Sequence, residues 1–409
     1  MASERYLKRV KNIVDASSFR EPEKVPVGMD YIGWPYGYAG VTLEEVVNDP
    51  VKHAEAYCAF MKDIPFEYTM NTGHYVPYDV YQALGSSHYT LCADKTTVQH
   101  AQAESGFIEE DEYEILINDT GYFINEYFPK RNVPIFKMPK EDAYEHLKEA
   151  ARRTAVQNRA EFLIRDICVN RYDIVPLMGP GPFAPLEGLD EYYGQFGPFY
   201  FADIDTIFDF YRGMMGTFED LAENRDLLDA AIEKLHEYNM KQMPPMMGGA
   251  PDGHPFPMCF GIYHSAAFLS PADYEKYWFG PFKRIMMPFA EAGKKIYIKG
   301  EGAFSHTIEK FKEMPKGSVI IQLDADDPFE MKKKVGDHQT LMCGLKTADI
   351  HTKDISSLKD IVKKLFDELA PGGGFMFYQD KPLLSPADAK PEVVKEVWEF
   401  ANEYSYGRS

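Results

Sequence analysis

FLSPADYEKYWFGPFKRIMMPFAEAGKKIYIKGEGAF, residues 268–304, places a predicted helix directly before a predicted strand. The Leu-Ser-Pro turn at 269–271 predicts the helix start, and Pro281 is expected to interrupt the helix. The apolar run at 295–299 predicts a strand that ends in the polar tip Lys-Gly-Glu-Gly at 299–302. Because catalytic side chains of parallel α/β proteins lie where strands end, this stretch predicts an architecture and a candidate site together.

Short β-type runs recur along the chain, and helical patterns separate most of them. This alternation favours a parallel sheet, and eight repeats favour a closed (β/α)8 TIM barrel over a doubly wound sheet. No Gly-x-Gly-x-x-Gly follows the first run, which disfavours a dinucleotide-binding fold. We therefore predict one barrel domain over residues 1–409. The expected strands are residues 25–31, 66–71, 174–178, 258–262, 295–299, 319–323, 341–344 and 374–378.

One region breaks the alternation between the second and third predicted strands. The run EYEILINDTGYFINEYF, residues 112–128, has β-rich arms around Asn-Asp-Thr-Gly at 118–121, which is a hairpin signal. We therefore predict that residues 86–135 form a β-hairpin insertion over the mouth of the barrel.

Composition and charge exclude several classes of function. The net charge of −20 leaves no basic stripe to replace the counterions of a nucleic acid, so no nucleic-acid partner is expected. No apolar run approaches 18 residues, so we expect no membrane span. The five cysteines are scattered without a Cys-x-x-Cys pair, and the charged N-terminus lacks an apolar signal region. These features predict a cytoplasmic protein.

Several motifs resemble the uroporphyrinogen decarboxylase superfamily. LMGPGPFAPLEGL (177–189) resembles its Gly- and Pro-marked strand end, and LSPADYEKYWFGPFKRI (269–285) resembles its Ser-Pro-x-x-Tyr helix. LMCGLKTADI (341–350) and the segment from LAPGGG to VVKEV (369–397) are similar to its closing units. The resemblance covers most of the chain. It implies a (β/α)8 barrel that is either a porphyrinogen decarboxylase or a cobalamin-dependent methyltransferase.

The decarboxylase branch is disfavoured. That branch places arginines after the first strand, where they pair with the carboxylates of the substrate. Here the matching place reads DYIGWPY, residues 30–36, without an arginine. The late Gly-His-Gly histidine of the branch falls near Asp-Lys-Pro at 380–382.

The methyltransferase branch fits better, although the ligands of its thiol-activating zinc are absent. The His-x-Cys of that branch is replaced by Lys299-x-Glu301, and its Cys-containing turn reads Ala-Pro-Gly-Gly-Gly at 370–374. The chain therefore looks more like the O-demethylase type of component, which passes a methyl group to a corrinoid protein. The cobalamin would be carried by that partner, since this chain lacks the Asp-x-His-x-x-Gly cobalamin motif.

The strand ends supply the candidate catalytic residues. Methyl transfer from an ether leaves an oxyanion, which needs a proton or a Lewis acid. Glu301 is a candidate proton donor if burial raises its pKa, and Lys299 is a candidate for stabilising the oxyanion, although the two can also form a simple ion pair. Tyr378 is the third catalytic candidate. His264, Glu301 and Asp324 follow three strands and form a tentative Zn²⁺ ligand set, while a polar site without metal is the competing interpretation.

Aromatic residues suggest the substrate. Phe, Trp and Tyr make up 14% of the chain, and a cluster follows the first strand. Core packing explains most aromatic residues in most proteins, but a mouth lined by them would suit a flat methoxylated donor. A quaternary amine held by cation–π contact and by Asp30 is the competing donor. The predicted substrate-binding residues are Asp30, Tyr31, Trp34, Tyr36, His74, Phe183, Lys346 and Lys381.

The leading hypothesis is O-demethylation of a small, methoxylated and preferably aromatic compound, with transfer to the cob(I)alamin of a corrinoid protein. A methylamine or betaine donor is the near variant. A carbon–carbon lyase acting on a small carboxylic acid, using Lys299, Lys346 and Lys381, is the alternative from another class, and a non-catalytic binding barrel is the third. A homodimer is also considered.

Overall fold

The main sheet is built from six parallel strands. The computed structural model describes residues 3–70, 77–86, 89–100, 107–177, 199–247 and 257–406. In it, neighbouring strands pair in the order β10-β9-β8-β7-β6-β5, and every pairing is parallel. The strands are β5 (Phe199–Phe201), β6 (Pro257–Tyr263), β7 (Lys295–Gly300), β8 (Val319–Gln322), β9 (Thr340–Leu345) and β10 (Phe375–Gln379).

The parallel pairing continues beyond β10. Val27 bridges Phe377 of β10, and Gly28 bridges Tyr68 of β1 (Tyr68–Thr69), which pairs with β4 (Val175–Pro176). All eight predicted strand segments therefore take part in parallel pairing, and β5 is an addition that the sequence reading missed. A β4–β5 pairing, which would close a barrel, is not among the pairings of the described residues. The fold is α/β with parallel sheets, and barrel closure stays a prediction.

An apolar cluster lies inside the curved sheet and is covered by α1 (Glu4–Ser17). It joins α1 side chains to those of strands that are far apart in sequence. The end of α1 lies at the amino ends of the strands, because the Gly374 N–H donates to the Ala16 carbonyl and the Lys295 ammonium donates to the Ser17 carbonyl. Members of the cluster are Tyr6, Val10, Ile13, Ala16, Tyr68, Met70, Val169, Val175, Leu177, Tyr297, Ile320, Met342, Met376 and Tyr378.

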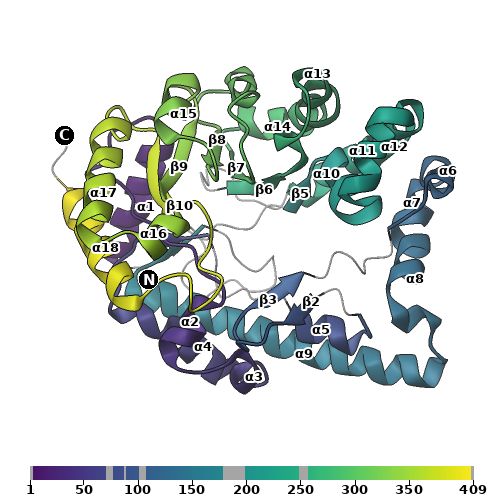
Figure 1. The fold of residues 1–409 in the computed structure, drawn as a ribbon, viewed down its shortest axis with the longest axis horizontal. Helices are drawn as coiled ribbons and strands as arrows, with labels where there is room; N and C mark the ends of the chain where they lie inside the picture. The colour runs from purple at the N-terminus through teal and green to yellow at the C-terminus, as the bar shows by residue number, and fades with distance from the viewer. Residues whose placement is uncertain are drawn as a thin grey trace.

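Helices cover the outer face of the sheet (Figure 1). Their apolar faces, with strand residues, form the larger core. The longest described helix, α9 (Lys140–Asp166), packs against α4 and α5. Besides α6, α7 and α8, whose bounds are given below, the remaining α-helices are α2 (Trp34–Ala39), α3 (Leu43–Val46), α4 (Pro50–Cys58), α5 (Tyr78–Ala83), α10 (Asp203–Thr206), α11 (Gly213–Glu223), α12 (Arg225–Met247), α13 (Pro271–Asp273), α14 (Gly280–Glu291), α15 (Pro328–Lys334), α16 (Thr347–Thr352), α17 (Ile355–Leu369) and α18 (Pro391–Tyr404).

Pro281 does not interrupt its helix as the sequence reading expected. A π-helical turn, Tyr274–Phe279, joins α13 directly to α14, so the chain is helical from Pro271 to Glu291. Pro281 lies in the first turn of α14, where a missing backbone N–H is tolerated more easily. The π turn is wider than an α turn and accommodates the proline that follows it.

The predicted β-hairpin insertion is only partly correct. An antiparallel hairpin is present, but it is formed by β2 (Tyr89–Leu91) and β3 (Val98–His100). The predicted arms are instead helical, in α6 (Tyr113–Asn118), α7 (Thr120–Tyr122), a π turn and α8 (Phe128–Asn132).

Helix capping and packing explain this error. The carboxylate of Asp119 accepts the N–H of Tyr122 at 2.9 Å, so this residue caps a helix rather than shaping a hairpin turn. Tyr113, Leu116 and Phe123 are all fully buried, and their spacing is helical rather than alternating. A short apolar run is ambiguous between helix and strand, and here contact with α12 selects the helix.

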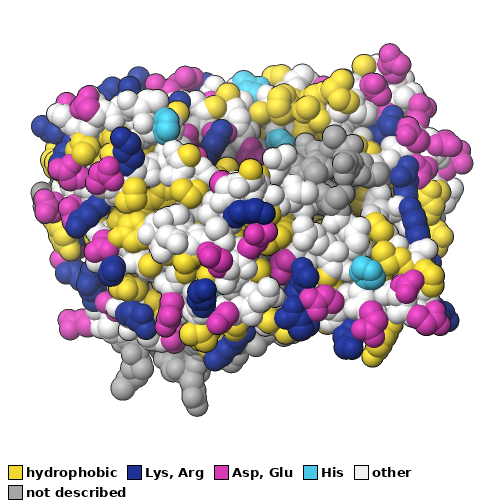
Figure 2. Space-filling model, turned by 60° about the horizontal axis from the view of Figure 1, so that its bottom comes forward, with side chains coloured by type: hydrophobic (Ala, Val, Ile, Leu, Met, Phe, Trp, Pro, Cys, Tyr) yellow, Lys and Arg dark blue, Asp and Glu magenta, His cyan; other side chains and the backbone are white. Residues whose placement is uncertain are grey.

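The surface is mixed in charge. Figure 2 shows acidic and basic side chains interspersed over the face in view, without a continuous basic stripe on it. Among the helices of the described residues, none combines the length and the apolar character that crossing a bilayer requires.

The first testable prediction concerns the close approach of the first strand segment to its neighbours. A Cβ at Gly28 would overlap the Tyr68 ring and lie 2.7 Å from Cδ2 of Tyr378. These two rings stack at 5.5 Å, so they have little room to yield. Gly28→Ala should lower the free energy of unfolding by about 1–3 kcal/mol in urea titrations. Gly121→Ala, which meets only the Asp119 carboxylate at 3.5 Å, is the control and should be neutral or stabilising.

Candidate functional site at the strand ends

The parallel register brings the residues after β6 and β7 together. Ile262 pairs with Lys299 and Tyr263 pairs with Gly300, so His264 and Glu301 come next on adjacent strands. The Glu301 N–H donates to the Tyr263 carbonyl at 3.1 Å, which continues the pairing by one bond. Two of the residues singled out by sequence are therefore neighbours.

His264 is held by a carboxylate from the helix after β5. Its Nδ1–H donates to Oδ1 of Asp209 at 2.8 Å. Asp209 lies on the π-helical turn Ile207–Tyr211, a type of turn that is frequent at functional sites. The His264 Nε2 has no hydrogen-bond partner among the described residues, so it is the nitrogen that can meet a ligand.

The charges around His264 keep it protonated at neutral pH. Desolvation, the largest single influence, lowers the pKa of His264. The hydrogen bond to Asp209 and the negative charges of Asp209, Glu301 and Asp205 together outweigh desolvation and raise this pKa to about 9. The imidazolium therefore carries protons on both ring nitrogens below pH 9.

Glu301 lies between His264 and Lys299. Its Oε2 is 4.0 Å from Nδ1 of His264, and its Oε1 is 3.6 Å from Nζ of Lys299. The exposed fraction of the side chain is 28% for His264, 36% for Glu301 and 27% for Lys299, so a ligand can reach all three. The predicted ion pair of Lys299 and Glu301 is present, and it extends to a protonated histidine.

A buried carboxyl group lies behind this cluster. Burial, the largest influence, raises the pKa of Asp205 to about 7, even though the Ser265 N–H and the Trp278 Nε1–H donate to the carboxylate. Asp205 is thus partly protonated near neutral pH. This limits the negative charge next to Asp209, and it leaves Asp209 as the main counter-charge of His264.

Apolar rings form one wall beside His264. The Phe208 ring meets the imidazole edge-on, with centroids 5.1 Å apart. Phe268 stacks on Phe208 at 6.0 Å and is 55% exposed, and Phe218 meets Phe268 edge-on. An aromatic surface is therefore available next to the protonated nitrogen, although it comes from residues other than those predicted.

Asp324 belongs to a second charged group, at the ends of β8 and β10. Its Oδ1 pairs with Nζ of Lys381 at 3.3 Å, and its Oδ2 accepts the Gly302 N–H at 2.8 Å. The second bond fixes the backbone directly after Glu301. Lys346 donates to the Ala325 carbonyl at 3.3 Å and is exposed. These residues shape the edge of the site.

The predicted zinc set is not assembled. His264 approaches Glu301, but Asp324 is turned toward Lys381 and the Gly302 backbone. Within the part of the chain that the structure describes, no three His, Cys, Asp or Glu side chains are placed to hold a metal ion. These residues do not fit a zinc ion, so no chemical step is assigned to one.

The aromatic residues after the first strand do not line an opening of the protein, as was predicted, but are buried. Tyr31, Trp34 and Tyr36 are at most 1% exposed and belong to the core. The Trp34 Nε1–H donates to the Ala389 carbonyl at 2.7 Å, and the Tyr36 hydroxyl lies 2.7 Å from Nε2 of His53. Large rings gain more from burial than from lining a wet opening, which explains the error.

Tyr378 and Asp30 are also buried. Tyr378 is fully buried in the interior cluster, and its hydroxyl accepts the Met70 N–H at 3.2 Å, so its position does not support the predicted catalytic role. The main chain of Asp30 is clamped by Gln379, with bonds of 3.1 and 2.6 Å. Two further predicted binding residues, His74 and Phe183, lie outside the described residues.

Asp209 is the functional candidate that sequence reasoning missed. A signal was present, since Asp205 and Asp209 are four residues apart in DIDTIFDFY, one helical turn after a β-type run. That run, β5, was itself not recognised as a strand.

Comparison with known proteins identifies a related fold. No protein-family model and no curated protein sequence matches the chain. Among solved structures, it is similar to a methyltransferase from Methanosarcina mazei, with a TM-score of 0.57 and 13% sequence identity. The match covers 97% of this chain and 98% of that chain, so the two share an architecture along their whole lengths.

The second prediction tests the Asp209–His264 pair. Because Asp209 supplies the main influences that raise the pKa of His264, Asp209→Asn should lower this pKa by at least one unit, toward 6.5 or below. The imidazole signals of His264 in NMR titrations measure the change. Asp142→Asn, an exposed residue of α9, should leave the pKa unchanged.

Unfolding measurements provide an independent check on this pair. The folded pKa of His264 lies above its unfolded value, so the pair stabilises the fold fully below about pH 6.5 and loses this effect as pH rises through 9. The stability difference between wild type and Asp209→Asn should be on the order of 2 kcal/mol at pH 6 and shrink by pH 10. A difference that is independent of pH would contradict the assigned charge state.

Proposed function

We propose that the protein is a methyltransferase that takes a methyl group from a small methoxylated compound, preferably an aryl methyl ether, and transfers it to the cob(I)alamin of a corrinoid protein. The observation that carries this proposal is the protonated and partly exposed His264, whose Nε2–H has no hydrogen-bond partner among the described residues. The full-length fold similarity to a methyltransferase supports the reaction class.

Leaving-group chemistry connects the site to an ether donor. Demethylation breaks a methyl–oxygen bond, and the oxygen keeps the electron pair. A phenoxide has a conjugate acid of pKa near 10, as the tyrosine side chain shows, whereas an aliphatic alkoxide is far more basic. An imidazolium of pKa about 9 is well matched to protonate a phenoxide-like oxygen as it departs.

His264 acts as the proton donor in this proposal, instead of Glu301. Nε2 gives its proton to the ether oxygen as the carbon–oxygen bond breaks, and the imidazole becomes neutral. Asp209 holds the ring through Nδ1 and stabilises the charged form before transfer. A reduced corrinoid, when its carrier is docked, supplies the strong nucleophile that accepts the methyl group.

Lys299 and Glu301 orient and balance the site. The Lys299 ammonium is 3.6 Å from Glu301 and can donate to an oxygen substituent of the donor. Together with His264 and Asp209, the pair makes a set of two cations and two anions, which suits a neutral substrate. The exposed Phe268 and its neighbour Phe208 offer rings on which a flat donor can stack.

The charges of the site also bear on the two alternatives, a quaternary amine donor and a lyase reaction. A quaternary amine would place a positive charge against the His264 imidazolium, which disfavours the betaine variant. The lysines required by the lyase alternative already have partners, since Lys299 meets Glu301, Lys381 meets Asp324, and Lys346 binds a carbonyl. Neither alternative is favoured by a specific contact.

The partner must reach the edge where the strands end. A carrier protein has to bring its corrinoid to the donor, and His264, Glu301 and Lys299 are partly exposed there. We therefore propose the carboxyl-end face of the sheet as the place where the corrinoid protein docks.

The third prediction tests the reaction and the proton donor together. Purified protein is mixed under anoxic conditions with cob(I)alamin, a cognate corrinoid protein, and either methoxybenzenes or methylamines, and methylation of the corrinoid is followed by visible absorbance. An aryl methyl ether should be the active donor class. His264→Gln should lower kcat by about 10²- to 10³-fold, since general acid catalysis commonly contributes that much.

His351→Gln is the matched control, because His351 is an exposed histidine of α16 whose one hydrogen bond within the described residues joins it to a backbone carbonyl. A further arm uses an aryl methyl ether with a strongly acidic phenol as leaving group. The His264→Gln defect should be smaller with that donor, because its oxygen needs less proton transfer. Equal activity of wild type and His264→Gln with every donor would overturn the assigned role, and absence of methylation with every donor would overturn the proposed reaction.

A further inference from the structure

A cavity of about 400 Å³ lies at the opposite edge of the sheet from the candidate site. Lys24 and Glu67 line it just before the first strand segment and β1, so it lies at the amino ends of these strands. Parallel pairing keeps this edge away from His264 and Glu301. The complete lining is Arg5, Lys8, Arg9, Asn12, Lys24, Glu67, Asn402, Glu403 and Tyr406.

We propose that this cavity is a binding site for a small oxyanion carrying at least two negative charges, such as phosphate or a dicarboxylate. The proposal is independent of the methyl-transfer reaction, since none of the lining residues belongs to the candidate catalytic site.

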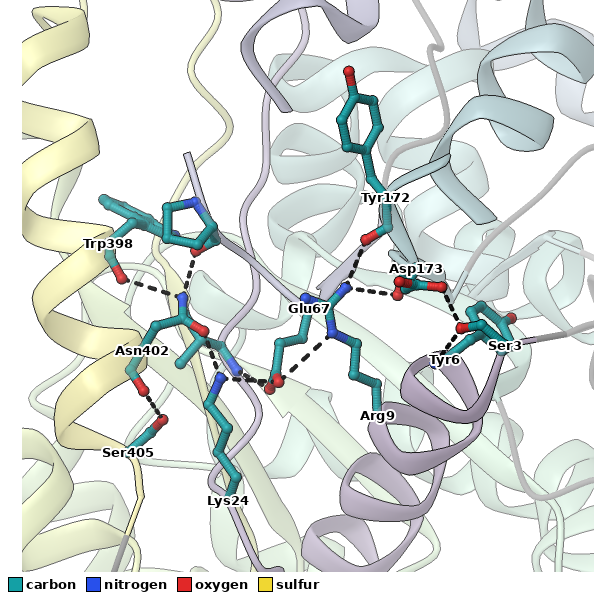
Figure 3. Close-up of polar contacts among 12 residues, drawn as sticks. Ser3, Tyr6, Arg9, Lys24, Glu67, Tyr172, Asp173, Trp398, Asn402 and Ser405 are labelled. Carbon is teal, nitrogen blue, oxygen red and sulfur yellow. Dashed lines mark hydrogen bonds and ion pairs between the residues drawn. The ribbon is translucent and has the colours of Figure 1, made fainter. Parts of the chain in front are cut away.

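Two buried cations share one buried carboxylate in the cavity wall (Figure 3). The Lys24 ammonium donates to Oε1 of Glu67 at 2.9 Å, and Nε of Arg9 lies 3.7 Å from the same oxygen. All three residues are at most 6% exposed. Glu67 is the carboxylate that both cations approach, and the charge of Asp173 also acts on Arg9. Desolvation is costly at such a buried place, so each cation there needs negative charge nearby.

Burial lowers the pKa of both cations. Desolvation is the largest influence on both groups and lowers the pKa of Arg9 and of Lys24, while Glu67 raises both values and Asp173 also raises that of Arg9. The positive charge of the nearby Arg5 lowers both pKa values further, because it repels the charged forms of Arg9 and Lys24. A bound anion would relieve this repulsion.

Unused donors are available at the same place. Nη1 of Arg9 donates to the Tyr172 and Asp173 carbonyls at 2.9 and 2.7 Å, which fixes the guanidinium plane. The Nη2 of Arg9 has no hydrogen-bond partner among the described residues. The Arg5 side chain is exposed and makes no ion pair with any of them. An arginine held in plane with free N–H groups is the arrangement that recognises carboxylate and phosphate oxygens.

An adjoining cavity of about 370 Å³ extends the positive surface. Arg5 and Arg9 line both cavities, and Lys62 and Arg171 line the second. The two linings together hold six Lys and Arg side chains against four Asp and Glu side chains. Lys8 pairs with Glu23, outside both linings, at 2.6 Å, and Lys62 lies 3.9 Å from Asp63. The remaining charged lining residues are Arg5, Arg9, Lys24 and Arg171 with Glu67, Glu399 and Glu403.

The size and polarity of the cavity define the ligand class. Charged and amide side chains and Tyr406 line the cavity, so a polar ligand finds hydrogen-bond and ion-pair partners there. The volume accommodates phosphate, a small phosphate ester or a dicarboxylate. Lys24 lies 4.8 Å from the Tyr406 ring and keeps its ammonium at the cavity wall.

Isothermal titration calorimetry of the full-length protein with inorganic phosphate, and separately with succinate, tests this proposal and distinguishes the two oxyanions. Sodium chloride at matched ionic strength is the reference. We expect saturable binding of at least one of them. Arg5→Gln should weaken that binding by about three- to tenfold, because it removes one cation at the cavity rim without disturbing a packed side chain.

Two further variants separate a local site from general electrostatics. Glu403→Gln removes an exposed rim carboxylate and should tighten binding, whereas Lys333→Gln removes an exposed charge of α15 outside both cavities and should leave it unchanged. Opposite effects of Arg5→Gln and Glu403→Gln, with no effect of Lys333→Gln, would support the site. No binding beyond the chloride reference, or equal weakening by Arg5→Gln and Lys333→Gln, would overturn it.

Discussion

Parallel pairing of the strands is the constraint on which the rest of this structure depends. In a parallel sheet all strands end at the same edge, so residues that follow different strands meet there. His264, Glu301 and Asp324 follow three different strands, each within two residues of the strand end, and they lie at this edge. The same pairing collects residues that precede strands, including Lys24 and Glu67, at the opposite edge.

The two edges hold charge in different ways. At the carboxyl edge, cations and carboxylates balance within one cluster, and partial exposure lets a ligand take part. At the amino edge, Arg9 and Lys24 are buried with one carboxylate between them. Burial makes each uncompensated charge costly there, whereas the carboxyl edge can keep a protonated histidine because Asp209 faces it directly.

Much of the fold could be predicted from the sequence. β-type runs such as 295–299 and 319–323 are apolar and bounded by Gly or polar residues, and they appear as β7 and β8 almost unchanged. Predictions that relied on short runs or on single residue types were weaker. Residues 113–128 are apolar enough for either a strand or a helix, and capping by Asp119 together with contact with α12 selects the helix. The tyrosines after the first strand were assigned to the mouth by composition, but neighbouring rings such as Phe60 bury them.

By itself, the sequence determined the α/β alternation, eight of the parallel strand segments, and the placement of Lys299, Glu301 and His264 where strands end. These features depend on local periodicity and on chain order, which are written directly in the residues. Only the tertiary structure decided that Asp209 binds His264, that Asp324 turns toward Lys381, and that Tyr378 and Trp34 are core residues. Side-chain partners from distant segments and the degree of burial set the charge state of each group. Both are properties of packing in three dimensions.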